Sequence, residues 1–322
     1  MKTVLVTGAA GYKGCVLVPK LLRAGCKVIA YDLLLFGSDG LPSHPDLTVI
    51  QGDIRDAKQY AKSVRGADSV IHMACISNDP SFELDPGLSR TINYDCFEPL
   101  VRASQEAGVR RFVYVSSSSV YGVSEAPEVT EEHPLVPLTD YNKYKALCEP
   151  ILLRYQSPNF TTVIVRPATV CGYSPRMRFD LTVNILTNLA VNRGLITVFG
   201  GGQKRPNIHI EDVTDLYVKL LEFPDSLVAG ETFNAGYENH TVSELAQFVK
   251  RVVEQEFPEK ATIRIQTTAS NDHRSYHVCS RKIAERLGYK PQRSIEDAVR
   301  DLCQAFRAGR FAKSLTEDNY IN

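Results

Sequence analysis

Short apolar segments alternate with helix-length segments through the first half of this chain, and this pattern limits its fold more than any other feature. The apolar segments are rich in Val and Ile and lie at Thr3–Val6, Lys27–Tyr31, Leu47–Ile50, Ser69–His72, Arg111–Val115 and Thr162–Val165. The helix-length segments between them are Cys15–Ala24, Ala57–Val64, Asn93–Glu106 and Tyr141–Tyr155. Strands that are apolar throughout and alternate with helices predict a parallel sheet covered on both faces. We therefore expect a doubly wound α/β fold.

The composition is that of an ordinary globular chain. Of 322 residues, 43% are hydrophobic and 23% are charged, and 37 Lys and Arg balance 37 Asp and Glu. A net charge of zero provides no general attraction for nucleic acid or an anionic membrane surface. We find no signal peptide and no apolar run near the roughly 20 residues of a membrane span. The eight scattered cysteines lack metal-ligand spacing, so we expect reduced thiols, no metal site and a cytoplasmic protein.

A glycine-rich turn follows the first apolar segment and leads directly into a helical pattern. The turn reads Thr7-Gly8-Ala9-Ala10-Gly11-Tyr12-Lys13-Gly14. Glycines at 8, 11 and 14 permit a tight turn, a close approach of the backbone to a diphosphate, and close packing of helix on strand. The diphosphate then lies at a helix N-terminus, where backbone N–H groups favour an anion. Gly8, Gly11 and Gly14, with Tyr12 among them, therefore predict a dinucleotide site in a Rossmann domain.

Asp32 ends the second expected strand, at the distance along the chain where a carboxylate accepts hydrogen bonds from the adenosine ribose hydroxyls. A 2′-phosphate would face this anion. The residues that follow, Leu33, Leu34 and Leu35, offer no cation to receive such a phosphate. We therefore expect NAD as the cofactor in preference to NADP.

The pattern of strands and helices becomes irregular after Arg166. Further helices are expected at Leu181–Asn192, Asp212–Leu221, Val242–Glu256, Ser280–Leu287 and Ser294–Ala308, with Gly288 capping the fourth of them. We expect residues 1–166 to form the NAD-binding Rossmann domain, with part of 206–223 returning to it. Residues 167–322 are expected to form mainly a smaller, irregular α/β substrate-binding domain, with the ligand pocket between the two.

Ser117, Tyr141 and Lys145 form the candidate catalytic set. Tyr141 and Lys145 are one helical turn apart and share a helix face, whereas Tyr144 has Cys148 in the corresponding position. A phenol with a pKa of about 10 is a poor base at neutral pH, but a neighbouring ammonium and a positive nicotinamide ring stabilise the phenolate. Ser117 follows a central strand, and its hydroxyl can hydrogen-bond the substrate oxygen from which the phenolate would take a proton. Pro150 is expected to kink or break the helix that carries this pair.

Taken in order, these motifs resemble the extended short-chain dehydrogenase/reductase family, specifically its NAD-dependent nucleotide-sugar epimerases and dehydratases. The resemblance rests on the glycine turn, Asp32, Gly52-Asp53-Ile54, His72-Met73-Ala74, Asn93, the SSSSVYG segment, Tyr141 with Lys145 and Glu149, Arg166-Pro167, and Arg205 to Asp212. It implies that Asp53 and Ile54 lie near the adenine and that Ala74 lies along the cofactor. It also implies that Ser117, Tyr141 and Lys145 are catalytic.

The two residues that follow the candidate catalytic serine limit which reactions the site can carry out. Relatives that eliminate water carry an adjacent Asp and Glu there, whereas this chain has Ser118 and Ser119. Relatives that epimerise carbons beside a ketone carry a cysteine where Ser119 stands. What remains is oxidation of a carbinol, and because NAD is regenerated in place when the hydride returns, we expect a nucleotide-sugar 4-epimerase. A nucleotide-sugar 4-dehydrogenase or ketoreductase is the alternative, and a non-catalytic NAD-binding protein is a third reading that the intact Tyr141 and Lys145 disfavour.

The expected partner is a nucleotide-diphosphate sugar. Arg205 matches the family's diphosphate arginine, and Arg274 lies near a second one at a displaced spacing. Thr169 stands where relatives commonly have Asn, and the segment Ser174–Asp180 adds arginines. Together these departures suggest altered recognition of the phosphates or of the base, of which a preference for GDP or CDP sugars over UDP sugars is one form. The full candidate set is Ser77, Thr169, Arg178, Asn184, Arg205 and Arg274. The resemblance also implies a homodimer formed by the helices at Asn93–Glu106 and Tyr141–Tyr155.

Overall fold

Seven strands form one parallel sheet in the computed structural model, which describes residues 1–260, 262–269 and 275–321. The strand order is β10-β6-β5-β4-β1-β2-β3. The strands are β1 (Thr3–Thr7), β2 (Lys27–Asp32), β3 (Leu47–Gln51), β4 (Ser69–His72), β5 (Arg111–Val115), β6 (Thr161–Pro167) and β10 (Glu231–Ala235). Every pair in this sheet is parallel, and β1 lies between β2 and β4, where the order of the strands reverses. The predicted doubly wound fold is confirmed.

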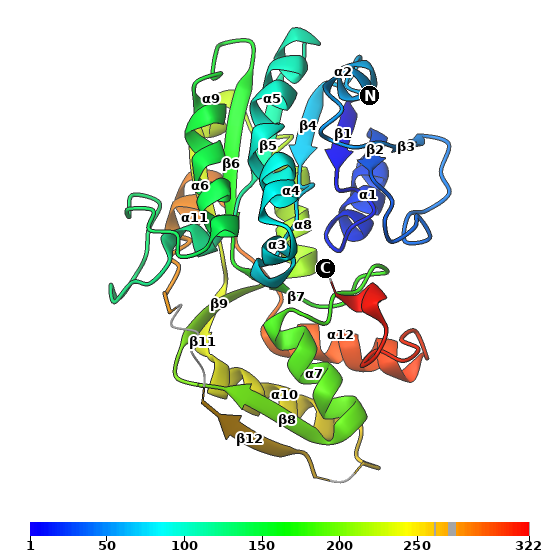
Figure 1. Ribbon diagram of the computed structural model, residues 1–322, viewed down its shortest axis with the longest axis vertical. Coiled ribbons are helices and arrows are strands. Elements are labelled where there is room, and N and C mark those ends of the chain that lie inside the picture. Colours follow the sequence, from blue (N-terminus) through cyan, green and yellow to red (C-terminus); the bar gives the residue numbers. More distant parts are fainter. Residues whose placement is uncertain (261, 270–274, 322) are drawn as a thin grey trace.

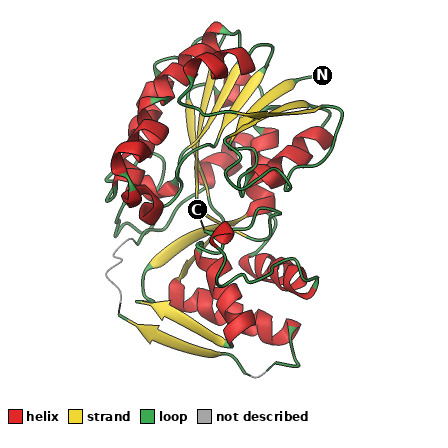
Figure 2. Ribbon diagram, turned by 45° about the vertical axis from the view of Figure 1, so that its right-hand side comes forward, coloured by secondary structure: helices red, strands yellow, loops and turns green. Residues whose placement is uncertain are grey.

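Helices cover both faces of the large sheet (Figures 1 and 2). One face carries α1 (Gly14–Arg23), α8 (Ile210–Lys219) and α11 (Arg281–Leu287), whose apolar side chains share one core with β1, β5 and β6. The other face carries α2 (Ala57–Ser63), α5 (Phe97–Glu106) and α6 (Asp140–Leu153), which form a second core around Phe97 and Phe112. Burial on both faces explains why the strands read as continuous apolar runs.

The segment before α5 differs from its predicted form. The helix predicted over Asn93–Glu106 is present as α5 from Phe97 onward, whereas its first residues belong to a π-helical turn over Thr91–Asp95. Two short helices, α3 (Asp79–Leu84) and α4 (Pro86–Arg90), precede this turn. The π-helical turn adds a residue to the helical repeat, so it changes which side chains face the sheet. Within this turn, Asn93 accepts a hydrogen bond from the Ile76 N–H and donates one to the Ile76 carbonyl, each at 2.8 Å. The irregular helix therefore holds the chain just beyond β4.

Pro150 lies inside α6 without ending it, so of the two predicted effects, a kink or a break, the break does not occur. A proline cannot donate a hydrogen bond to the carbonyl four residues earlier, which costs an isolated helix several kcal/mol. In α6 the neighbouring residues Cys148, Ile151 and Leu152 are buried in the core. Packing against the sheet therefore outweighs the lost bond.

A smaller part of the molecule lies at the carboxyl edge of the large sheet (Figure 1). It contains a three-stranded sheet of β7 (Thr169–Cys171), β9 (Lys204–His209) and β11 (Glu238–Thr241), and a pair of β8 (Leu195–Phe199) with β12 (Arg264–Thr268). Its helices α7 (Thr182–Arg193), α10 (Val242–Glu256) and α12 (Ile295–Arg307) share a third core. The glycine cap predicted after α11 is confirmed, because Gly288 has a φ of 64° and donates to the Ala284 carbonyl.

Segments of the second half return to the large sheet. Helix α8, from the expected returning segment 206–223, packs beside α1. Strand β10 pairs in parallel with β6, and the short α9 (Asp225–Val228) precedes it. The two halves of the sequence are therefore interleaved in one structure, which places the smaller part firmly over the end of the sheet.

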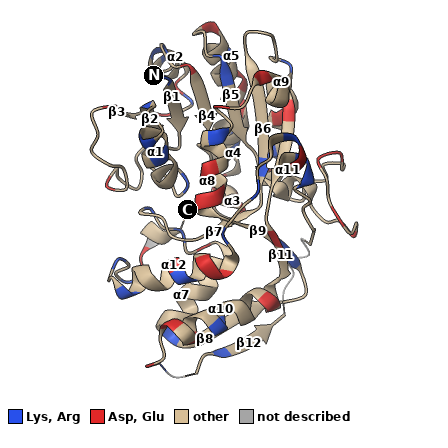
Figure 3. Ribbon diagram, turned by 180° about the vertical axis from the view of Figure 1, so that it is seen from behind, with Lys and Arg blue, Asp and Glu red and all other residues tan. Residues whose placement is uncertain are grey.

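The surface carries both signs of charge on both parts of the molecule, as expected from the zero net charge (Figure 3). The eight cysteines are free thiols. In the described ranges, no helix combines the length and the apolar character that crossing a membrane requires.

Candidate active site

A cavity of about 550 Å³ lies where the large sheet meets the smaller part. Its walls come from the glycine turn, the ends of β2, β4, β5 and β6, the start of α6, and the segment between β7 and α7. Parallel α/β sheets bind ligands at the carboxyl ends of their strands, where the strand order reverses. This cavity occupies that position.

Gly8 and Gly14 of the glycine turn have no room for a side chain. A Cβ atom on Gly8, whose φ is +70°, would lie 2.9 Å from the Ala74 nitrogen, and one on Gly14 would lie 2.3 Å from the Ala9 carbonyl oxygen. Such a turn brings bare backbone to the cavity at the point where α1 begins. Because backbone N–H groups at a helix N-terminus favour phosphate, the turn fits the diphosphate of a dinucleotide.

The Asp32 carboxylate is fixed beside this turn. Its Oδ2 accepts a hydrogen bond from the Ala10 N–H at 3.0 Å, and its Oδ1 accepts one from the Leu34 N–H at 2.8 Å. Asp53, Ile54 and Ala74 line the same cavity, as do Gly8, Gly11, Gly14 and Tyr12. All the residues predicted to hold the cofactor therefore border one continuous space.

We predict that Asp32→Asn weakens NAD binding about tenfold to a hundredfold, because an amide cannot accept both ribose hydrogen bonds and carries no charge. Isothermal titration of the purified variant with NAD measures the effect. The matched control is Asp39→Asn, since Asp39 is exposed and does not line the cavity. Equal affinities for the two variants would contradict the role given to Asp32.

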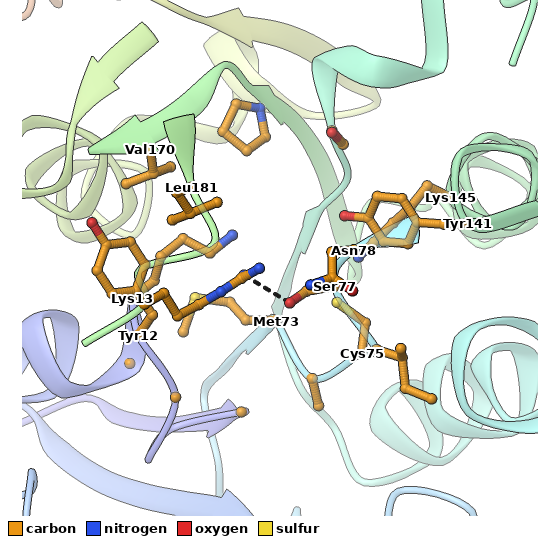
Figure 4. Close-up of a pocket in the computed structure, with 18 of the residues that line it drawn as sticks. Tyr12, Lys13, Met73, Cys75, Ser77, Asn78, Tyr141, Lys145, Val170 and Leu181 are labelled. Carbon is orange, nitrogen blue, oxygen red and sulfur yellow. Dashed lines mark hydrogen bonds between the residues drawn. The ribbon is translucent and has the colours of Figure 1, made fainter. Parts of the chain in front are cut away.

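Tyr141 and Lys145 lie at the opposite end of the cavity from the glycine turn (Figure 4), and Ser117 lines the same cavity. The Ser117 hydroxyl lies 2.7 Å from the Ser119 hydroxyl, which in turn donates to the amide oxygen of Asn142. The Lys145 ammonium donates to the Val115 carbonyl at 3.0 Å and lies 5.1 Å from the centre of the Tyr114 ring. These contacts hold Ser117 and Lys145 in place.

Burial raises the pKa of the Tyr141 phenol well above its ordinary value. The Cys75 thiol nearby acts in the same direction, while Arg178 and the Ser117 hydroxyl lower this pKa in part. In the protein alone the phenol therefore stays protonated. A positive charge brought into the cavity would stabilise the phenolate and make Tyr141 a usable base.

A buried ion pair joins the elements that carry these residues. Arg166 at the end of β6 binds both carboxylate oxygens of Glu149 in α6, at 3.0 Å and 2.6 Å. Glu149 also accepts a hydrogen bond from the Ser116 hydroxyl at 2.6 Å, and Arg166 donates to the Tyr121 hydroxyl. The serine-bearing end of β5 is thus tied to the helix that bears Tyr141 and Lys145.

The predicted substrate residues are only partly gathered at the cavity. Ser77, Thr169, Arg178 and Arg205 line it. Asn184 does not line it, because its side chain is buried behind the wall and is bound to the Tyr12 hydroxyl, the Arg178 carbonyl and the Gly172 N–H. This position favours a structural role for Asn184. Arg274 lies outside the described residues.

Arg178 does not face the cavity as an isolated cation. Its guanidinium pairs with the Asp180 carboxylate at 2.5 Å and donates to the Ser77 hydroxyl at 2.8 Å. Asn78 donates to the same carboxylate at 2.7 Å. The loop after β4 and the segment before α7 are therefore joined across the cavity.

Several cavity residues were not predicted from the sequence. They include Lys13, Asn142, Asp180, Leu181 and Tyr276. Asn142 is next to the catalytic tyrosine, so its position on the helix could have indicated it. The others have no such signal, because they depend on contacts between segments far apart in the chain.

Ser118 and Ser119 both border the cavity, beside Ser117. The Ser118 hydroxyl lies 3.5 Å from the Tyr276 hydroxyl. Neither position therefore presents a carboxyl group to a bound substrate.

The fold and the cavity are those of a Rossmann protein with a site for a dinucleotide. Residues 4–236 match the model of the NAD dependent epimerase/dehydratase family, and the chain belongs to this family, whose cofactor is NAD.

Known relatives differ in how much of their length the chain spans. It is 35% identical over 254 residues to the protein y4nG of Sinorhizobium fredii, covering 77% of this chain but 60% of that one. It is 27% identical over 315 residues to the UDP-glucose 4-epimerase of Lactobacillus helveticus, covering 92% and 94% of the two chains. The structure of a dTDP-glucose 4,6-dehydratase from Streptomyces venezuelae with NAD bound aligns with a TM-score of 0.84 at 25% identity, over 96% of this chain and 98% of that one.

Proposed function

We propose that this protein is an NAD-dependent 4-epimerase of a nucleotide sugar, working through a transient 4-keto intermediate. The observation that carries this proposal is the composition of one cavity. Ser117, Tyr141 and Lys145 line the same cavity as the glycine cradle, at its other end, whereas positions 118 and 119 carry hydroxyls and no acid. The cavity therefore has the groups for oxidising and reducing a carbinol, and lacks the acidic pair expected for eliminating water.

In the proposed reaction Tyr141 removes the proton from the C4 hydroxyl, which the Ser117 hydroxyl orients by a hydrogen bond. The glycine turn and Asp32 would hold NAD, which would supply the hydride acceptor and donor for the same carbon. Lys145 stabilises the phenolate electrostatically, and Tyr141 gives the proton back to the sugar oxygen. Return of the hydride to the other face of the sugar yields the C4 epimer.

Arg205 and Arg178 are proposed to hold the substrate's diphosphate, with Ser77 and Thr169 contacting the sugar or the phosphates. All four border the cavity. Hydrogen bonds from a guanidinium group to phosphate oxygens are charge-assisted and stronger than hydrogen bonds between neutral groups, which favours this arrangement. The relatives named UDP-glucose 4-epimerase support the reaction, and they align over nearly the full length of both chains.

Incubating the enzyme with UDP, GDP and CDP sugars tests the proposal. We expect a C4 epimer to form from one of these sugars, detected by NMR of the sugar protons, with no net NADH. Steady accumulation of NADH and of a ketosugar would instead identify a nucleotide-sugar 4-dehydrogenase. Release of water to give a 4-keto-6-deoxy sugar would exclude both.

We also propose a cytoplasmic homodimer built on α5 and α6, with residues 1–166 as the main cofactor-binding part and 167–322 mainly binding substrate. Leu147 and Leu153 of α6 support the dimer, because they expose 40% and 36% of their surface on a helix that otherwise packs against the sheet. Sedimentation velocity distinguishes a dimer from a monomer.

A further inference from the structure

A lysine stands inside the dinucleotide turn. Lys13 immediately precedes Gly14, where α1 begins. Its side chain leaves the turn and extends into the cavity near Val170 and Leu181, toward the end that holds Tyr141 (Figure 4). In the part of the chain that the structure describes, the Lys13 ammonium has no ion pair and no hydrogen-bond acceptor. A cation thus projects into the cavity with no protein group to balance it.

The surroundings of Lys13 make its charge costly. Burial lowers the pKa of its ammonium to about 7. The positive Lys145 of α6 and Arg178 from the segment before α7 lower this pKa further, and only Cys75, after β4, opposes them. Arg178 has its own carboxylate in Asp180, whereas Lys13 has none. An uncompensated charge in such a site destabilises a protein unless a ligand supplies the counter-charge.

The route of the cofactor identifies that ligand. A dinucleotide has to extend from Asp32, past the glycine turn, to Tyr141 and Lys145, because these residues border one cavity. Its diphosphate then lies at the turn, over the N-terminus of α1. Lys13 belongs to this turn, and its side chain points along the same route. The diphosphate is the anion that any bound dinucleotide brings to this position.

We propose that Lys13 binds a phosphate oxygen of the NAD diphosphate and supplies a positive charge that the backbone of the glycine turn lacks. NAD binding should also change the protonation state of Lys13. Above pH 7 the Lys13 amine of the free protein is largely neutral, so it takes one proton from solvent when the diphosphate arrives and holds it as an ammonium. NAD binding through Lys13 therefore consumes a proton and weakens as pH rises above 7.

The first test is the affinity for NAD, measured by isothermal titration. Lys13→Met keeps an unbranched apolar chain without the charge, and we expect at least about tenfold weaker binding. Lys13→Arg keeps the charge and is expected to bind within about threefold of the wild type. The control is Lys27→Met, which removes an exposed lysine at the start of β2 and should change nothing.

The second test counts protons. Titrations at about pH 8 in Tris and in HEPES, which differ in ionisation enthalpy, give the number of protons taken up per NAD bound. Tyr141→Phe serves as the background, because the phenol can release a proton when NAD binds. Lys13 should account for close to one proton in this background, and both Lys13→Met and Lys13→Arg should abolish that uptake.

A structural role for Lys13 predicts different results. Without NAD, we expect Lys13→Met to unfold at the same temperature as the wild type or higher, because it removes a buried unpaired charge. Unchanged NAD affinity and unchanged proton uptake in Lys13→Met would overturn the proposal. A loss confined to the binding of UDP, GDP or CDP would also overturn it, because it would assign Lys13 to the substrate.

Discussion

Replacing Tyr141 with phenylalanine is expected to lower turnover about a hundredfold to ten-thousandfold, which is the usual contribution of a positioned acid or base. The variant loses one hydroxyl at the end of the cavity, and the cofactor cradle around Gly8 and Asp32 is untouched. NAD affinity should therefore stay within a few fold of the wild type. Steady-state kinetics on the active nucleotide sugar and a titration with NAD measure the two effects separately.

The pH dependence gives a further check on Tyr141. Because burial raises the pKa of this phenol, the fraction present as phenolate increases with pH, and so should the wild-type rate. Tyr141→Phe should show no such increase. Tyr144→Phe is the matched control: this tyrosine lies three residues away on α6, stacks against Phe82 and does not border the cavity. Full turnover in Tyr141→Phe would rule out the proposed mechanism.

Replacing Glu149 with glutamine is expected to lower the free energy of unfolding by about 3–5 kcal/mol, the cost of breaking a buried ion pair by removing one partner. Glu149 and Arg166 expose only 4% and 7% of their side chains, so solvent cannot stabilise the arginine that remains. The Ser116 hydroxyl loses its charged acceptor at the same time. Urea denaturation followed by circular dichroism gives the change in stability.

An exposed ion pair on the same helical layer provides the comparison. Glu98 and Arg154 expose 46% and 59% of their side chains, and we expect Glu98→Gln to cost less than about 1 kcal/mol. Because Glu149 joins α6 to the end of β5, Glu149→Gln should also reduce turnover in the fraction that stays folded. Equal losses of stability in the two glutamine variants would show that the buried pair does not hold these elements together.

The fold could be predicted because its evidence is local. Apolar strands, their spacing and the glycine turn are contained in short segments, and each requires one arrangement of the backbone. The same rules predict that Ser117, Tyr141 and Lys145 lie close to one another, since a strand end and one helix face meet at the edge of a parallel sheet. The roles of these residues stay predictions.

Other features could not be read from the sequence because they depend on distant contacts. Asn184 looked like a ligand on a helix start, but its amide is used by Tyr12 and Gly172, which lie far away in the sequence. The interruption of the expected helix near Asn93 is linked to its hydrogen bonds with Ile76, beyond β4. Lys13 looked like any lysine in a turn, and only the walls of the cavity make its charge unusual.

Strand β10 has a consequence for how this chain folds during synthesis. It is the outermost strand of the large sheet beside β6, yet more than sixty residues separate the two in the sequence. Until residues 231–235 leave the ribosome, β6 is an open edge with unpaired backbone groups and a Val-Ile-Val run at its centre, which invites pairing with another chain. The family match ends at residue 236, one residue after β10, so the shortest fragment with all seven strands coincides with the end of the shared segment. Fragments that stop at residue 166 should therefore aggregate. During synthesis, the nascent chain should depend most on chaperones after residue 166 and before residue 236 has been added.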